Sequence, residues 1–117
     1  MKYDGGKPKL SLIYSSFLTD VAKVREYGVK KYGADDGWKS TDAIKHYDAC
    51  LRHMFQAMEA YKNNSIEEML DAESGVSHLA HAACNIMFLI EEMYVNKMVK
   101  GFEFSAINLK EVDDGSK

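Results

Sequence analysis

Three long segments of the chain repeat apolar side chains at the spacing of an α-helix. They run from about Ser16 to Tyr32, from about Asp42 to Tyr61 and from about Ser77 to Lys100. Within each segment apolar residues return every three or four positions, which places them on one helix face. A short fourth helix is expected from Ser65 to about Asp71. The pattern predicts an all-α fold, a small helical bundle of three long helices plus a short one.

The largest apolar side chains are expected to form the core of this bundle. The third helix is apolar almost all the way round, so we expect it to be buried on more than one side. One protomer of this length has too few elements to cover that helix, and we expect a homodimer or homotetramer to complete the bundle. The expected core stripes are Ala43, Tyr47, Cys50, Leu51, Met54, Met58 and Tyr61 on the second helix, and Leu79, Ala83, Ile86, Ile90 and Met93 on the third.

Capping residues and glycines mark where these helices begin and end. Gly33 and Gly101 follow the first and third helices, as helix-terminating glycines do. We treat residues 1–117 as a single helical domain, with residues 1–9 as an N-terminal arm and 111–117 as a flexible tail. Residues 102–104 alternate like a short strand. The expected N-caps are Ser15 or Ser16, Thr41, Ser65 and Ser77.

Composition excludes several classes of partner. The net charge of the 117 residues is −3 and there is no basic run that could follow a phosphate backbone, so we expect no nucleic-acid polymer as partner. No apolar stretch approaches the length of a membrane span, and the N-terminus does not resemble a signal peptide. Cys50 and Cys84 are expected to be reduced. Together these features predict a cytoplasmic protein.

Polar groups interrupt the apolar third helix at positions that share a face. His81 and Asn85 lie three and seven positions after His78, so all three share one helix face. Burying these polar groups costs free energy unless they have hydrogen-bond partners. Asp71 and Glu73 precede this helix, and the second helix offers His53.

Three interpretations of these polar groups remain open. They are structural histidines, a metal site in which imidazole and carboxylate groups bind a divalent ion, or a site for a polyphosphate. In the last case Lys30, Lys31, Arg52 and His53 would receive the phosphates, and Tyr32 and Trp38 would stack on a base.

Four blocks of sequence together resemble a known family. They are Gly6-Lys7-Pro8-Lys9-Leu10-Ser11-Leu12-Ile13, then Glu26-Tyr27-Gly28-Val29-Lys30-Lys31-Tyr32-Gly33 followed by Trp38, then Leu51-Arg52-His53, and finally Asp71-x-Glu73-Ser74-Gly75 with His78-Leu79-Ala80-His81-Ala82. In this order they are similar to the phage and bacterial dATP/dGTP diphosphohydrolase N-terminal domains, which are loosely MazG-like. Where MazG-like enzymes carry Glu-x-x-Asp, this chain has His78-x-x-His81.

The resemblance implies metal-dependent hydrolysis of a (deoxy)nucleoside triphosphate to the monophosphate and pyrophosphate, with Mg²⁺ or Mn²⁺ between facing helices. The alternatives are a non-catalytic protein that senses or sequesters a small nucleotide, and a helical adaptor whose histidines are structural. For the enzyme we assign Glu26, Asp71 and Glu73 to catalysis, His53, His78 and His81 to the metal, and Lys30, Lys31, Tyr32, Trp38, Arg52 and Asn85 to the substrate.

Overall fold

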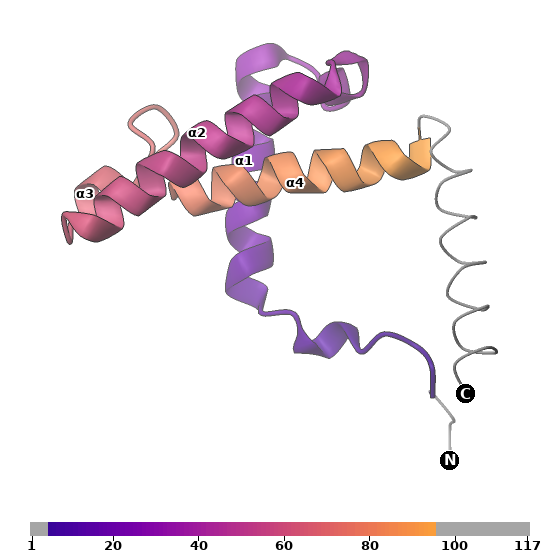
Figure 1. Cartoon of the computed structure of the whole chain (residues 1–117). Coiled ribbons are helices and arrows are strands. Elements are labelled where there is room, and N and C mark those ends of the chain that lie inside the picture. The colour runs from indigo at the N-terminus through magenta and orange to yellow at the C-terminus, as the bar shows by residue number, and fades with distance from the viewer. Residues whose placement is uncertain (1–4, 96–117) are drawn as a thin grey trace.

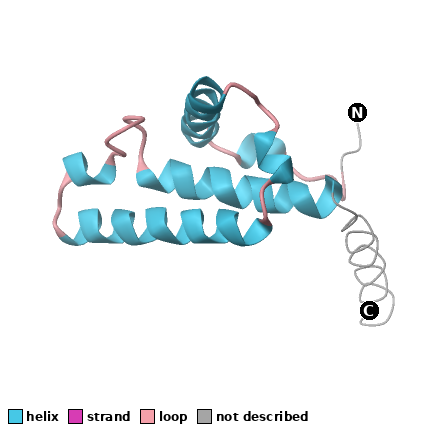
Figure 2. Cartoon of the chain, turned by 90° about the horizontal axis from the view of Figure 1, so that it is seen from above, coloured by secondary structure: helices cyan, strands magenta, loops and turns pink. Residues whose placement is uncertain are grey.

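The computed structural model describes residues 5–95 as a set of helices. Two long helices, α2 and α4, run side by side in opposite directions, and α1 crosses them on one side (Figures 1 and 2). Within this range the only extended pairing is the single bridge between Leu70 and Ser77, so the all-α prediction is confirmed. No described helix is long and apolar enough to cross a membrane. The elements are η1 (Leu10–Leu12), α1 (Ser15–Tyr32), η2 (Gly37–Ser40), α2 (Ala43–Lys62), α3 (Ile66–Met69) and α4 (His78–Val95).

A small apolar core lies where α1 crosses α4. Val21 and Val24 of α1 pack with Ala80 and Cys84 of α4, and Phe88 is among the half-buried residues around them. Neither cysteine is in a disulfide, as predicted, and burial raises the pKa of the Cys84 thiol to about 11. This core fixes the angle at which α1 passes over α4.

The faces that α2 and α4 turn toward each other differ from those predicted. The predicted core stripes are largely exposed: Leu51 is 53% exposed and Ile86 is 46% exposed. The buried faces carry small and polar side chains instead, among them Ala57 and Ala60 of α2 and Ala82 of α4, each at most 2% exposed. Alanine lets two helices approach closely, and His53 of α2 meets His78 and His81 of α4 across this seam.

The predicted helix caps are half correct. Ser65 Oγ accepts the backbone N–H of the third residue of its helix turn at 3.0 Å, and Ser77 Oγ likewise accepts a backbone N–H of α4 at 3.0 Å. The other two caps are wrong. Tyr14 occupies the N-cap position of α1, and Asp42 occupies that of α2, without a side-chain hydrogen bond in either case. Thr41 instead donates its hydroxyl to a carbonyl of the preceding turn at 3.2 Å.

The predicted helix ends fall partly outside the described residues. Gly33 terminates α1 in the left-handed conformation, with φ of 75°, as predicted. The predicted end of the third helix at Gly101, the strand-like residues 102–104 and the tail at 111–117 all lie beyond residue 95.

Two glycines provide a matched test of backbone conformation. Gly28 lies in the middle of α1, Gly75 has φ of 75° in the loop before α4, and an added Cβ would meet no atom within 4 Å at either place. Gly28→Ala should raise the free energy of unfolding by up to about 1 kcal/mol, because alanine is the better helix former. Gly75→Ala should lower it by about 1 kcal/mol, because the left-handed conformation strains an L-residue. Urea denaturation measures both, and equal effects of one sign would contradict the assigned conformations.

Candidate active site

The loop between α3 and α4 folds back on itself and holds two carboxylates near the start of α4. The Asp71 backbone N–H donates to Val76 O at 2.9 Å, and the Gly75 N–H donates to Asp71 O at 2.8 Å. The left-handed conformation of Gly75 closes this turn. The turn therefore presents the side chains of residues 71–74 to the first turns of α4.

Asp71 is fixed inside this turn by the backbone. Its Oδ2 accepts the N–H groups of Glu73 at 3.1 Å and Ser74 at 2.8 Å. Burial opposes ionisation of Asp71, but these bonds and the Ser74 hydroxyl outweigh it and hold the pKa of this carboxyl below its ordinary value. Asp71 is thus an ionised carboxylate with a fixed direction.

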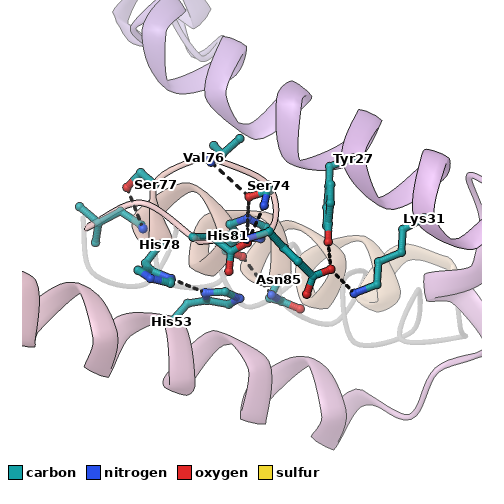
Figure 3. A network of polar contacts seen from close by, with 12 residues as sticks. Tyr27, Lys31, His53, Ser74, Val76, Ser77, His78, His81 and Asn85 are labelled. Atoms are coloured by element: carbon teal, nitrogen blue, oxygen red, sulfur yellow. Dashed lines mark hydrogen bonds and ion pairs between the residues drawn. The ribbon is translucent and has the colours of Figure 1, made fainter. Parts of the chain in front are cut away.

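Three histidines meet in the seam between α2 and α4 (Figure 3). Asp71 lies beside them. His53 of α2 lies against two histidines of α4. Its ring stacks on that of His81 with centroids 4.5 Å apart, and its Nδ1 is 2.9 Å from Nδ1 of His78. His78 and His81 are buried, and His53 is half-buried. Burial, followed by the neighbouring His81 and His78, lowers the pKa of His53 to about 4, so its imidazole is neutral at physiological pH.

Two of these histidines and Asp71 have the arrangement of metal ligands. One ligand atom from each of His53, Asp71 and His78 lies within 4.8 Å of the other two. The two Nδ1 atoms at 2.9 Å face each other, so without a cation one must carry the hydrogen that the other accepts. Two imidazoles and a carboxylate are a common ligand set for divalent transition metals. The residues present therefore fit a cation of this kind.

His81 has a different position from the other two histidines. Its Nε2 is 2.6 Å from Ser74 Oγ and 4.0 Å from Asp71 Oδ2. The Ser74 hydroxyl in turn accepts the Val76 N–H at 3.1 Å. His81 therefore lies beside the ligand group and ties the loop to α4.

The second carboxylate, Glu73, reaches across to α1. Its Oε1 accepts hydrogen bonds from Lys31 Nζ, at 2.8 Å, and from the Tyr27 hydroxyl. These two bonds lower the pKa of Glu73, and the same contacts raise the pKa of Lys31 and that of Tyr27. The sequence analysis assigned Lys31 and Glu73 to the same site, and the structure brings their side chains together. The contact of Tyr27 with Glu73 was not predicted. Tyr27 precedes Lys31 by four positions, so the two residues share a face of α1, and this spacing could have predicted that Tyr27 lies at the same site.

A cleft of about 630 Å³ lies between α1, η2 and α4, next to the histidines. Three predicted substrate-contact residues, Tyr32, Trp38 and Asn85, line it together. Asn85 also donates to the backbone oxygen of His81 at 2.9 Å, so it stands between the cleft and the histidine cluster. The remaining lining residues are Val24, Arg25, Gly28, Ala34, Gly37, Thr41, Lys45, His46, Cys84 and Phe88.

Aromatic rings and cationic groups form part of the lining of this cleft. Trp38 stacks on Phe88 with centroids 5.1 Å apart and planes only 10° from parallel, so Trp38 is an anchor for its loop as well as a wall of the cleft. The Arg25 guanidinium lies 5.3 Å from the Phe88 centroid. A flat apolar wall with cations at its edge suits a molecule that combines an aromatic ring with negative charge.

Behind the cleft lies a buried ionisable pair that the sequence did not single out. His46 Nε2 is 3.2 Å from Trp38 O and 3.5 Å from Glu92 Oε1, and both side chains are at least nine-tenths buried. Both neighbours of this nitrogen are acceptors, so Nε2 carries hydrogen. The pair fastens η2 to α2 and α4 and so holds Trp38 in place.

Three of the predicted site residues are placed away from the histidine cluster. Glu26 borders an apolar groove between α1 and α4, lined by residues such as Phe17 and Ile90. Lys30 and Arg52 are exposed on the outer faces of α1 and α2. Their spacing in sequence matched the family blocks, but the rotation of each helix turns them outward.

The neutral state of His53 predicts how stability depends on pH. In metal-free protein the folded state keeps His53 unprotonated down to about pH 4, while an unfolded histidine binds a proton below its ordinary value of 6.5. The unfolded state therefore binds more protons in this interval, and the free energy of unfolding should fall as pH drops from 6.5 to 4. Urea denaturation in a chelator tests this, and His53→Gln should flatten the dependence. A wild-type profile no steeper than that of His53→Gln would contradict the prediction.

Comparison with known proteins identifies the family of the chain. No solved structure gives a significant match. A protein of Salmonella phage PMBT28 named dATP/dGTP diphosphohydrolase is 37% identical over 89 residues, which cover 76% of this chain and 28% of the phage protein. The chain thus spans less than a third of that relative. Residues 1–101 match the family described as dATP/dGTP diphosphohydrolase, N-terminal, and the chain belongs to this family.

Proposed function

We propose that this domain binds a (deoxy)nucleoside triphosphate in the cleft and hydrolyses it to the monophosphate and pyrophosphate, with a divalent cation at His53, Asp71 and His78. One observation carries the proposal: an aromatic cleft with cationic edges lies near a group of potential metal ligands. Asn85 lines the cleft and donates to the backbone oxygen of His81, whose ring stacks on that of the ligand residue His53. A nucleotide has the matching parts, a flat base at one end and a polyphosphate at the other. The family of the chain supports the same class of substrate.

The ligand set favours Mn²⁺ over Mg²⁺ as the cation. Mg²⁺ prefers oxygen ligands, whereas two of the three available groups are imidazole nitrogens. When bound, such a cation would neutralise charge on the phosphates during phosphoryl transfer. The chain supplies Asp71 already ionised and His53 already neutral, the two states in which these groups bind metal.

Residues of the chain have distinct roles in this proposal. Glu73 is an ionised carboxylate on the same loop as Asp71, and in this proposal it orients and deprotonates the attacking water. Lys31 holds Glu73 and adds a positive charge on the side from which the phosphates would enter. Trp38 and Tyr32 provide the apolar surface for the base.

A second function, nucleotide binding without hydrolysis, is favoured by the contacts of Glu73. Both hydrogen bonds to its Oε1 come from α1, so this atom is already occupied in the ligand-free protein. If a bound nucleotide does not displace these contacts, the domain would sequester or sense the nucleotide and release it intact. The two functions share the cleft and differ only in whether products form.

Metal binding is tested with histidine variants and a histidine control. Isothermal titration with Mn²⁺ should show one site, and His53→Gln or His78→Gln should weaken it by at least about tenfold, because each removes a ligand. His46→Gln is the matched control, since His46 is buried in the same seam and is not part of the ligand group. Mg²⁺ should bind more weakly than Mn²⁺. Equal loss of Mn²⁺ binding in all three variants would reject this ligand set.

Hydrolysis is tested with a panel of deoxynucleoside triphosphates and Mn²⁺ or Mg²⁺. Pyrophosphate release is expected, and Glu73→Gln should reduce kcat by roughly 100-fold or more because it removes the base. Lys31→Met should reduce kcat/KM, while Lys23→Met on the exposed side of the same helix should not. Retention of intact nucleotide with no product would support the binding function. Neither binding nor turnover of any nucleotide would reject both functions.

A further inference from the structure

The buried carboxylate of Glu92 is only partly satisfied by its neighbours. Within residues 5–95, its Oε1 is the one buried side-chain polar atom without a hydrogen-bond partner. The imidazole of His46 lies beside it, with Nε2 at 3.5 Å, and both residues are less than a tenth exposed. Burying a carboxylate oxygen without a hydrogen bond costs free energy, and an apolar side chain of similar size would avoid that cost. Stability alone therefore does not account for a glutamate at this position.

Two acceptors compete for the single hydrogen on His46 Nε2. Trp38 O is 3.2 Å away and receives the hydrogen bond, whereas Glu92 Oε1, at 3.5 Å, lies close enough for an ion pair but makes no hydrogen bond. One N–H group cannot make a full hydrogen bond to both acceptors at once. A hydrogen bond to an ionised carboxylate is stronger than one to a carbonyl. If the imidazole turned its hydrogen to Glu92, the new bond would therefore offset the bond that Trp38 loses.

The short helix η2, which carries Trp38, depends on this hydrogen bond. The hydroxyl groups of η2 and of the residue after it donate within the same turn. Among residues 5–95, the one hydrogen bond that joins η2 to a long helix is the bond between His46 and Trp38 O. The other attachment of Trp38 is the stacking of its ring on Phe88. Loss of the His46 bond would thus leave this wall of the cleft held mainly by stacking.

We propose that Glu92 is a positioning residue of the cleft, which acts through His46 as the alternative acceptor and so lets Trp38 move aside while a ligand enters or leaves. In the closed arrangement His46 donates to Trp38 O, and the indole forms the cleft wall. In the open arrangement His46 donates to Glu92 Oε1, and η2 carries the indole away from Phe88. The inference rests on the proposed function for the identity of the ligand, a nucleotide. The movement of Trp38 itself is measurable in the ligand-free chain.

Fluorescence quenching by acrylamide tests this movement without a ligand, because Trp38 is the only tryptophan of the chain. Glu92→Leu should lower the quenching constant, since it leaves Trp38 O as the one acceptor for His46, and His46→Leu should raise it. Glu92→Gln, which keeps the shape of the side chain, should lower the constant by less. Glu91→Leu is the control, since it makes the same substitution at the exposed neighbouring position. The free energy of unfolding of Glu92→Leu should equal or exceed that of the wild type.

Two quenching results would overturn the proposal. If Glu92→Leu raises the quenching constant as His46→Leu does, Glu92 supports the bond to Trp38 instead of competing for its hydrogen. If the constant stays unchanged in both Glu92 variants, the carboxylate does not act on Trp38.

Stopped-flow binding of dATP in a chelator, followed by Trp38 fluorescence, tests the consequence for a ligand. Glu92→Leu should lower the association and dissociation rate constants together, by roughly two- to tenfold, the range expected from one net hydrogen bond. The dissociation constant should change less than either rate. Unchanged rates beside altered quenching would overturn the role of Glu92 in ligand exchange. If no deoxynucleoside triphosphate binds, the proposed function fails, and the quenching constants still decide whether Glu92 acts on Trp38.

Discussion

The contact on which the structure depends is the meeting of His53 with His78 and His81 across the α2–α4 seam. Imidazoles are costly to bury without partners, and a helix this apolar offers none along its own length. The 2.9 Å contact between His53 and His78 and the stacking of His53 on His81 supply partners only if these two faces oppose each other. The alanines on either side make that approach possible. The rotation of both helices follows from satisfying this group.

The same contact shapes the candidate site. Because burial keeps His53 neutral, its ring nitrogen is available to a cation or to a neighbouring N–H, without prior loss of a proton. The tight turn at residues 71–75 adds a carboxylate whose direction is set by backbone N–H groups rather than by a flexible side-chain partner. Groups fixed in this way lose little freedom when a ligand binds. The fold therefore contains a buried polar cluster whose hydrogen-bonding groups are only partly satisfied by other residues of the chain.

Much of the fold could be predicted from the sequence, and the part that could not has a single cause. Apolar periodicity located the three long helices, because period and length are local properties, and the cap at Ser65 located the short one. Their rotation was predicted wrongly, since the largest side chains, such as Leu51 and Ile86, were assumed to point inward. In this chain, polar groups with a strong need for partners determine the inner face.

The candidate site shows the same division. His53, His78 and Asp71 were identified because buried polar groups stand out in an apolar segment, and the structure brings them together. Lys31 and Glu73 meet across 42 positions of sequence, a pairing that no local pattern encodes. Tyr27 and the His46–Glu92 pair were missed because each depends on how α1 and η2 lie across the bundle. Local chemistry therefore identifies candidate residues, while the crossing of helices decides which of them lie together.

The seam also limits how the helix pair is stabilised. A seam built from histidines and alanines contributes little hydrophobic stabilisation, because little apolar area is removed from water there. Large apolar side chains such as Leu51 and Ile86 lie elsewhere on the same two helices, where they are about half exposed. A ligand that binds only the folded state would stabilise that state by mass action. The geometry of the site therefore depends on polar contacts, above all that of His53 with His78, rather than on a large buried apolar core.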